Sequence, residues 1–232
     1  MEKGLIITID GPSGVGKSTI AKLVAKKMGF LYVDTGAIYR TITWKALQSN
    51  IDLRNEDLLL KMIIGLKIEF KHIDHKKNNY YKIFLDKRDV TRKIREPRID
   101  QYVSDLAKLP KIREQLISLQ RNLAKEGNIV MEGRDIGSKI LSNADIKFYF
   151  TASEGERVNR RYRELKNKGF EVSYEEVKKQ LVNRDSIDSR RKCSPLKKTK
   201  DAIVIDSTNK NINEVMDIII NIIKNYRKSG KE

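Results

Sequence analysis

An α/β fold built on a doubly wound, five-stranded parallel sheet is predicted by three features of the sequence. Short apolar runs rich in β-branched residues alternate with longer segments whose apolar residues recur every three or four positions. Polar residues follow directly after the apolar runs, where the carboxyl ends of parallel strands form a binding edge. A glycine-rich segment separates the first apolar run from the first helical pattern. Alternating strands and helices imply crossover connections, and therefore helices on both faces of the sheet.

The first strand is expected at residues 5–9, where Leu-Ile-Ile-Thr-Ile suits a buried parallel strand. Apolar residues at helical spacing between 20 and 28 predict the first helix, and Gly29 stands at its expected C-cap. The other four strands are expected at 30–33, 128–131, 146–150 and 202–205. The polar residues just past the five strands are Asp10, Asp34, Glu132, Thr151 and Asp206.

One segment departs from this alternation. Residues 66–70 and 81–85 alternate apolar and polar side chains with period two, which predicts an antiparallel hairpin with a short third strand near Val90. His72 and His75 fall in the expected loop of that hairpin, and with no further ligand nearby they are expected to be exposed rather than bound to a metal.

The remaining helices are marked by proline, glycine and capping signals. Helices are expected between Pro97 and Pro110 and over 111–126, 153–168 and about 211–226. Ser173-Tyr174-Glu175-Glu176 fits a capping box that opens one more helix after Gly169. The helix at 153–168, its successor and the stretch up to Lys200 carry a concentration of arginines.

The composition limits the class of protein. No run of eighteen apolar residues is present, so no membrane span is expected, and the single cysteine, Cys193, favours a reducing cytoplasm. The formal net charge of +17 is compatible with nucleic-acid binding or with binding of a small polyanion. Because the lysines are scattered, the arginines are concentrated between 157 and 191, and no nucleic-acid-binding signature is present, the small polyanion is favoured.

Residues 11–18 read Gly-Pro-Ser-Gly-Val-Gly-Lys-Ser and match G-x-x-x-x-G-K-[ST] between a strand and a helix; this segment is called the phosphate loop. Its glycines let the backbone wrap around an anion with the N–H groups pointing inward. Lys17 can then reach the β- and γ-phosphates of a nucleotide, and the Ser18 hydroxyl can ligate Mg²⁺. A glycine-rich turn without a ligand would leave Lys17 and Ser18 unexplained.

The rest of the chain favours a compact kinase among phosphate-loop proteins. The segment 209–212 lacks the aspartate of a guanine-reading Asn-Lys-x-Asp motif, and the strand at 128–131 does not end in paired acids as in remodelling ATPases. Arg40 and Arg134 follow the second and third strands and can clamp the phosphate of an acceptor. The arginine-rich helix pair can close over ATP as a lid and exclude water.

Two motifs are more specific than the phosphate loop: Asp-Thr-Gly-Ala-Ile-Tyr-Arg at 34–40 and Glu-Gly-Arg-Asp-Ile-Gly at 132–137. With them and the segment 9–18, the chain resembles the bacterial cytidylate kinase family over nearly its whole length. The other residues that carry the resemblance are Ser104, Pro110 to Arg113, Arg160-Arg161, Arg184-Asp185 with Asp188 and Arg191, Cys193-Ser194-Pro195-Leu196, and Asp206-Ser207-Thr208. The hairpin insertion is also similar to the extra segment of this family.

The resemblance implies a P-loop kinase domain over 1–232, with its core at 1–65, 98–152 and 201–232, a nucleoside-monophosphate-binding (NMP) insertion at about 66–97 and a helical lid at about 153–195. It implies phosphorylation of CMP or dCMP by ATP with Mg²⁺ in a cytoplasmic monomer that needs neither nucleic acid nor membrane. Adenylate- or uridylate-type specificity and a basic nucleic-acid-binding protein remain the alternatives. No catalytic base is required for this chemistry.

The resemblance also implies roles for individual residues. ATP would be held by Gly11, Pro12, Ser13, Gly14, Val15, Gly16, Lys17, Ser18 and Thr19, with Ser18 on the metal. The CMP phosphate region would be held by Ser13, Thr35, Tyr39, Arg40 and Arg134, the cytosine edge by Ser104, Arg113 and Asp135, and the sugar by Arg184 and Asp188. The catalytic set would be Lys17, Arg134, Asp135, Arg160, Arg161 and Arg191, with Arg160, Arg161 and Arg191 near the transferring phosphate.

Three positions depart from the family pattern. Ile187 stands where the family commonly has another arginine, which alters the charge of the lid. Glu132 and Thr35 replace the more usual aspartate and serine, and each keeps the polar function of the residue that it replaces.

Overall fold

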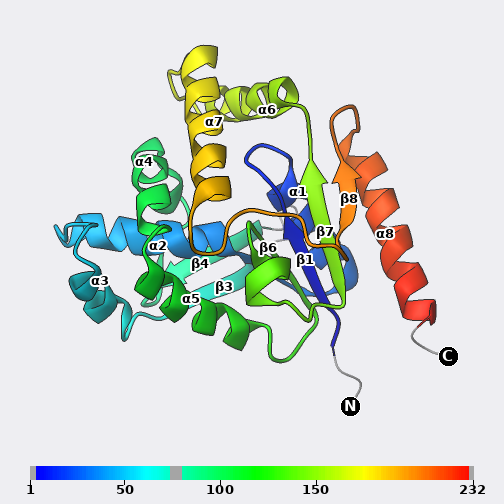
Figure 1. Ribbon diagram of the computed structural model, residues 1–232, viewed down its shortest axis with the longest axis horizontal. Coiled ribbons are helices and arrows are strands. Elements are labelled where there is room, and N and C mark those ends of the chain that lie inside the picture. Colours follow the sequence, from blue (N-terminus) through cyan, green and yellow to red (C-terminus); the bar gives the residue numbers. More distant parts are fainter. Residues whose placement is uncertain (1–3, 74–79, 230–232) are drawn as a thin grey trace. The chain divides into compact units, whose positions relative to one another are not determined.

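The computed structural model describes residues 4–73 and 80–229, and its main sheet has five strands in the order β2-β6-β1-β7-β8 (Figure 1). The strands are β1 (Ile6–Asp10), β2 (Leu31–Asp34), β6 (Ile129–Gly133), β7 (Ile146–Thr151) and β8 (Ile203–Asp206). β1 pairs in parallel with β6 and with β7, and β7 pairs in parallel with β8. The prediction of an α/β fold with a five-stranded parallel sheet is confirmed.

Every strand of this sheet runs one or two residues past its predicted end and includes the polar residue that was expected to follow it. Asp10, for example, pairs with Gly133 in the register of β1 and β6. The reason is that a parallel ladder is made by backbone groups, which pair whatever the side chain is. The polar residues therefore belong to the rigid ends of the strands and not to the loops beyond them.

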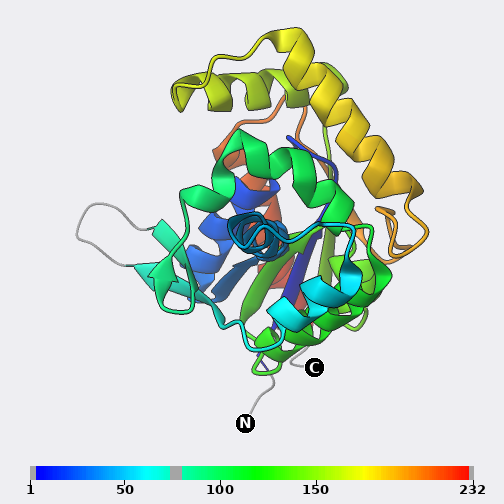
Figure 2. The same ribbon diagram turned by 90° about the vertical axis from the view of Figure 1, so that its left-hand side faces the viewer.

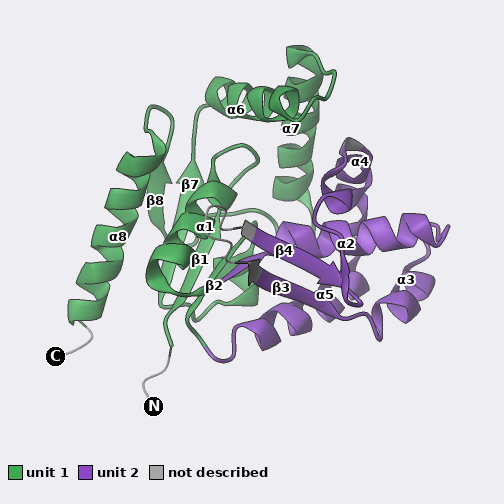
Figure 3. Cartoon of the chain, turned by 180° about the vertical axis from the view of Figure 1, so that it is seen from behind, with its two compact units in different colours: residues 1–30, 127–232 green, residues 31–126 purple. Residues whose placement is uncertain are grey.

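The described chain divides into two compact units, coloured separately in Figure 3: unit 1 comprises Met1–Phe30 and Gly127–Glu232, and unit 2 comprises Leu31–Glu126. The helices of unit 1 are α1 (Lys17–Met28), the π-helical turn η2 (Ile136–Ile140), α6 (Glu154–Asn167), α7 (Tyr174–Arg190) and α8 (Ile212–Ser229). Ile7, Ile9, Phe148 and Phe150 form the buried centre of the sheet. α1 ends as predicted, because Gly29 adopts the left-handed conformation and donates to the carbonyls of Ala25 and Lys26.

The helices α6 and α7 form a pair with a small core of its own, which lies on one side of unit 1 (Figure 2). Val158 and Leu165 of α6 pack against Val177 and Leu181 of α7. The predicted capping box is present at the start of α7, because Ser173 and Glu176 bond to each other's backbone N–H. These two helices make up most of the predicted lid.

Unit 2 contains the predicted insertion, a three-stranded antiparallel sheet of β3 (Ile68–Ile73), β4 (Tyr80–Leu85) and β5 (Arg88–Asp89). Its helices are α2 (Thr35–Gln48), α3 (Glu56–Ile63), the 3₁₀ turn η1 (Lys93–Arg95), α4 (Pro97–Leu106) and α5 (Pro110–Leu123). The expectation that His72 lies in the loop is wrong, since the strand continues through Ile73 by pairing His72 with Tyr81. His75 lies outside the described residues.

Among residues 4–73 and 80–229, no helix has both the length and the apolar character that a membrane crossing requires.

Candidate active site

The phosphate loop connects β1 to α1, and its backbone depends on glycine at two positions in particular. Gly16 has φ 88° and caps the N-terminus of α1 in the left-handed conformation. Gly14 has φ 78°, and a Cβ atom on it would lie 2.7 Å from the carbonyl oxygen of Arg157 in α6. The loop therefore adopts a conformation that other residues disfavour, and α6 lies directly against it.

Lys17 is buried at the start of α1, and its Nζ donates a 2.6 Å hydrogen bond to the Pro12 carbonyl. Burial first, and then the positive charge of Arg134, lower the pKa of Lys17 from 10.5 to about 7. Protein groups alone thus do not fully stabilise this ammonium group. A phosphate bound in the loop would supply the missing negative charge and favour the protonated lysine.

Ser18 offers one hydroxyl oxygen in the first turn of α1, the position from which a phosphate-loop serine reaches a nucleotide-bound metal. Mg²⁺ takes few protein ligands in such sites and most of its oxygens from water and phosphate, so a single hydroxyl suits it. Within the part of the chain that the structure describes, no group of three or more His, Cys, Asp and Glu side chains is placed to hold a metal by itself. The donor set therefore fits a metal that arrives with the nucleotide.

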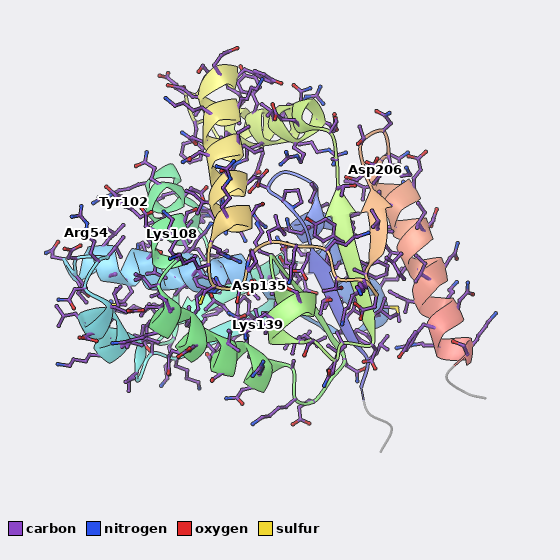
Figure 4. The ribbon with its side chains drawn as sticks, in the orientation of Figure 1. Arg54, Tyr102, Lys108, Asp135, Lys139 and Asp206 are labelled. Atoms are coloured by element: carbon purple, nitrogen blue, oxygen red, sulfur yellow. The ribbon has the colours of Figure 1, made fainter. Side chains whose placement is uncertain are left out.

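An ion-pair network joins the phosphate loop to the end of β6 and to α7. The Arg134 Nε donates to Asp188 at 2.8 Å, and its Nη2 donates to the Ser13 hydroxyl at 2.8 Å. Arg191 donates to Asp135 at 3.3 Å and to Asp188 at 3.4 Å. The structure therefore brings together five of the predicted site residues. Asp135, which is separated from the end of β6 by Arg134, is labelled in Figure 4.

Asp188 is the carboxylate of this network that lies among several arginines. Burial by itself raises the pKa of Asp188, but Arg134, Arg184 and Arg191 hold it below its ordinary value. Asp188 is therefore an anion whose charge is stabilised by three neighbouring guanidinium groups.

Asp10 positions the turn that carries Arg134 and Asp135, a role that the sequence analysis missed. At the end of β1 its carboxylate accepts hydrogen bonds from the backbone N–H groups of Ile136 at 2.9 Å and Gly137 at 2.8 Å. Burial raises the pKa of Asp10 from 3.8 to about 6, although these two bonds oppose the shift. The only signal in the sequence was an acidic residue at the end of an otherwise apolar strand.

The raised pKa of Asp10 gives a testable dependence of stability on pH. Between about pH 4 and pH 6 the folded state keeps a proton that the unfolded state has released, so this group's contribution to the free energy of unfolding falls as the pH rises. A shift of about two units corresponds to about 3 kcal/mol. The stability of the wild type relative to Asp10→Asn should therefore fall by about that amount over this range in urea titrations. The exposed Asp217→Asn serves as control, and an Asp10→Asn difference that does not vary with pH would contradict the expectation.

The two predicted arginines of the lid are placed differently from each other. Arg161 pairs with Glu164 on the same helix at 2.8 Å and is partly exposed. Arg160 donates from Nε to Glu156 at 2.7 Å and turns its other nitrogen atoms toward the phosphate loop and Ser207.

Unit 2 carries the other predicted acceptor residues on α2, α4 and α5. Thr35 begins α2, directly after Asp34, whose carboxylate caps the helix by accepting from the Ala37 N–H. Arg40 donates to Asp100 of α4 at 3.0 Å, a partner that the sequence analysis did not anticipate. The carboxylate that holds Arg40 therefore comes from a helix that begins at Pro97, which is 57 residues further along the chain than Arg40.

The residues predicted to read the base in unit 2 are buried. Ser104 lies on α4, and Arg113 lies near the start of α5. The Arg113 guanidinium stands 5.5 Å from the centre of the Tyr39 ring and donates to the Ala107 carbonyl at 3.2 Å. The predicted site residues are therefore divided between the two units: the phosphate loop and the ion-pair network in unit 1, and Thr35, Tyr39, Arg40, Ser104 and Arg113 in unit 2.

Comparison with known proteins gives consistent matches over nearly the whole chain. The family model described as "Cytidylate kinase" matches residues 7–225. A protein named cytidylate kinase from Bacillus cereus (strain ATCC 10987 / NRS 248) is 44% identical over 223 residues, which cover 96% of this chain and 97% of the relative. The relative from Bacillus thuringiensis (strain Al Hakam) has the same name, identity and coverage.

Among solved structures, an uncharacterized protein from Eubacterium ventriosum ATCC 27560 matches with a TM-score of 0.50 at 16% identity, covering 96% of this chain and 99% of that one. This likeness concerns the fold alone.

Proposed function

The chain belongs to the cytidylate kinase family, and on that premise we propose that it transfers the γ-phosphoryl group of ATP to CMP or dCMP, giving ADP and the diphosphate. The observation that carries the proposal is the 2.8 Å hydrogen bond from Arg134 to the Ser13 hydroxyl. This bond links the phosphate loop, which is the donor side, to the residues expected to hold the acceptor phosphate. Donor and acceptor groups thus meet at one side chain.

On the donor side, the backbone N–H groups of residues 11–19 and the Lys17 ammonium group would hold the phosphates of ATP. The left-handed glycines and the N-terminus of α1 support this role, since both direct partial positive charge toward an anion. The Lys17 ammonium group would stabilise the negative charge that develops on the phosphoryl group during transfer. Mg²⁺, when bound through Ser18 and the phosphate oxygens, would neutralise further charge on the nucleotide.

On the acceptor side, Arg40, Arg134 and Arg191 would compensate the repulsion between the phosphates of CMP and ATP. Tyr39, Thr35 and Ser13 would hold the CMP phosphate region together with them. Carboxylates already hold these arginines in place: Asp100 holds Arg40, and Asp188 contacts both Arg134 and Arg191. Guanidinium groups that are fixed in advance lose less entropy when a phosphate binds.

Base recognition would depend on Ser104, Arg113 and Asp135, and sugar recognition on Arg184 and Asp188. A carboxylate accepts from the N4 amino group of cytosine, and guanidinium and hydroxyl donors match its O2 and N3 acceptors. The reaction needs no protein base, because phosphoryl transfer depends on in-line positioning and on electrostatic stabilisation. Arg161, which lies on the predicted lid, would place its positive charge near the transferring phosphate.

The proposal includes a cytoplasmic monomer that uses small-molecule substrates and needs no nucleic acid. The charge of +17 is then assigned to solubility and to attraction of anionic nucleotides.

A coupled assay of ADP formation tests the function directly. Purified protein with ATP and Mg²⁺ should turn over CMP and dCMP much faster than UMP or AMP. A preference for AMP or UMP would favour the other base specificities. Binding that increases with polynucleotide length, without turnover of any monophosphate, would instead favour the nucleic-acid-binding alternative.

A further inference from the structure

Side chains of α6 contact two backbone carbonyls of the phosphate loop. The Arg157 Nη1 donates to the Ser13 carbonyl at 3.1 Å, and the Arg160 Nη1 donates to the Val15 carbonyl at 3.4 Å. The two arginines are one helical turn apart on one face of α6, and the two carbonyls are two residues apart in the loop. The spacing of the donors on the helix therefore matches alternate peptide groups of the loop.

The contacts fix the direction of the N–H groups in the same peptide planes. The described chain contains no cis peptide bond, and in a planar trans peptide the N–H points opposite to the C=O. Because the carbonyls of Ser13 and Val15 face α6, the N–H groups of Gly14 and Gly16 point away from it. These N–H groups are among those that a phosphate loop directs at its anion.

Asp185 of α7 binds the preceding peptide group, Pro12–Ser13, through its N–H rather than through its carbonyl. Its carboxylate accepts from the Ser13 N–H at 2.9 Å and pairs with Arg157. The carbonyl of that same plane belongs to Pro12 and accepts from the Lys17 Nζ at 2.6 Å. Two consecutive peptide planes of the loop are thus held by Asp185 and Arg157 from outside the loop and by Lys17 from within it, and each of these hydrogen bonds involves a charged group.

The Arg160 guanidinium group is already engaged with protein atoms. Its Nε donates to Glu156 at 2.7 Å, its Nη1 also donates to the Ser207 hydroxyl at 3.0 Å, and its Nη2 donates to the Ser207 carbonyl at 2.6 Å. The Ser207 hydroxyl lies 3.1 Å from the Val15 carbonyl and also 3.1 Å from the Thr151 carbonyl, so its one proton is shared between the loop and β7. An arginine with these partners is suited to holding the loop rather than to following a moving phosphate.

We propose that Arg157 and Arg160 are positioning residues: they hold the Ser13–Gly14 and Val15–Gly16 peptide groups so that their N–H groups face the donor phosphates. Arg160 then acts on ATP through the loop and does not touch the transferred phosphate. This assignment rests on the proposed function, because it presumes that the loop binds a nucleotide. It also gives Asp185 and Ser207 a role, as the groups that complete the set of contacts around the loop.

The test uses ADP, which lacks the phosphate that is transferred. Arg160→Met should weaken ADP binding about tenfold in calorimetry, since a charged hydrogen bond to the loop is lost. The KM for ATP should rise as ADP binding weakens, whereas kcat at saturating nucleotide and the KM for CMP should change far less. Arg163→Met is the matched control, because Arg163 is an exposed arginine on the same helix.

Two further variants separate a loop-positioning role from a general loss of structure. Ser207→Ala should also weaken ADP binding, but by less than Arg160→Met. The effects of the two substitutions should be far from additive in the double variant, since both act on the Val15 peptide. Arg160→Lys should recover little ADP affinity, because one ammonium group cannot reach Glu156, Val15 and Ser207 together. Amide NMR signals of Gly14 and Gly16 should shift in Arg160→Met and stay unchanged in Arg163→Met.

Loss of kcat with unchanged ADP affinity in Arg160→Met would overturn the proposal, since that result belongs to a residue on the transferred phosphate. Additive Arg160 and Ser207 effects would overturn it as well. If the wild type binds ADP and the variants behave as stated but CMP is not phosphorylated, the proposed function fails while the positioning role stands.

Discussion

Replacing Lys17 with methionine is expected to abolish phosphoryl transfer and leave the fold intact. The ammonium group is buried beside the Pro12 carbonyl, and its lowered pKa indicates that burial and the neighbouring Arg134 disfavour its charge. Loss of one group that stabilises transition-state charge costs about 10²–10³-fold in kcat in other enzymes. A phosphate-loop lysine acts on the phosphates themselves, so the loss here should reach at least that range. Methionine has a similar length and carries no charge, so thermal stability should not fall.

The coupled assay with saturating ATP and CMP measures the loss, and thermal unfolding checks the fold. Lys27→Met is a matched control, because Lys27 is an exposed lysine near the other end of α1. A folded Lys17→Met protein with turnover close to that of the wild type would refute the assignment of the donor site.

Replacing Asp135 with alanine is expected to lower CMP phosphorylation about tenfold or more and to narrow the preference for CMP over UMP. If the carboxylate accepts from cytosine N4, UMP presents a carbonyl at that position and meets repulsion instead of a hydrogen bond. A hydrogen bond to a charged group is worth about 1.5–3 kcal/mol, which corresponds to this loss. The ratio of kcat/KM for CMP and UMP is therefore the informative measurement.

A second role of Asp135 has to be separated from base recognition, because its carboxylate also accepts from Arg191 at 3.3 Å. If Asp135 served only to hold Arg191, the alanine variant would lose rate with both substrates equally and the ratio would stay constant. Asp135→Asn distinguishes further: its amide can donate to the uracil O4, so UMP should improve relative to CMP. An unchanged ratio in both variants would require the base-reading role to be withdrawn.

The strands and the phosphate loop could be predicted because their signals are local. The five apolar runs correspond to the five strands of the main sheet. The C-terminal end of each strand was predicted one or two residues too early, because the polar residue there pairs through its backbone. The capping box at Ser173 and the glycine at the end of α1 depend on neighbours within a few positions, and both predictions are confirmed. The strand β3 exceeded its prediction for the same reason as the parallel strands, since His72 pairs through its backbone.

Motif order and spacing also sufficed for the family, because the segments at 34–40 and 132–137 are each specific and occur in the expected order. The family model and the 44% identical relatives confirm that resemblance. The roles assigned to individual site residues stay predictions, and the experiments above address those with the largest expected effects.

The sequence by itself determined the fold class, the family and the residue types of the candidate site, because these follow from short patterns along the chain. Only the tertiary structure decided the partners of those residues. Asp10 holds the turn at Ile136, Asp100 holds Arg40, and Asp185 holds the Ser13 peptide. Such pairs are separated by 60 to 172 positions, and no local pattern encodes which distant side chain will face a given backbone group. Arg160 is the clearest case: the family resemblance implied a place near the transferring phosphate, whereas the packing of α6 against the loop directs its Nη atoms to Val15 and Ser207.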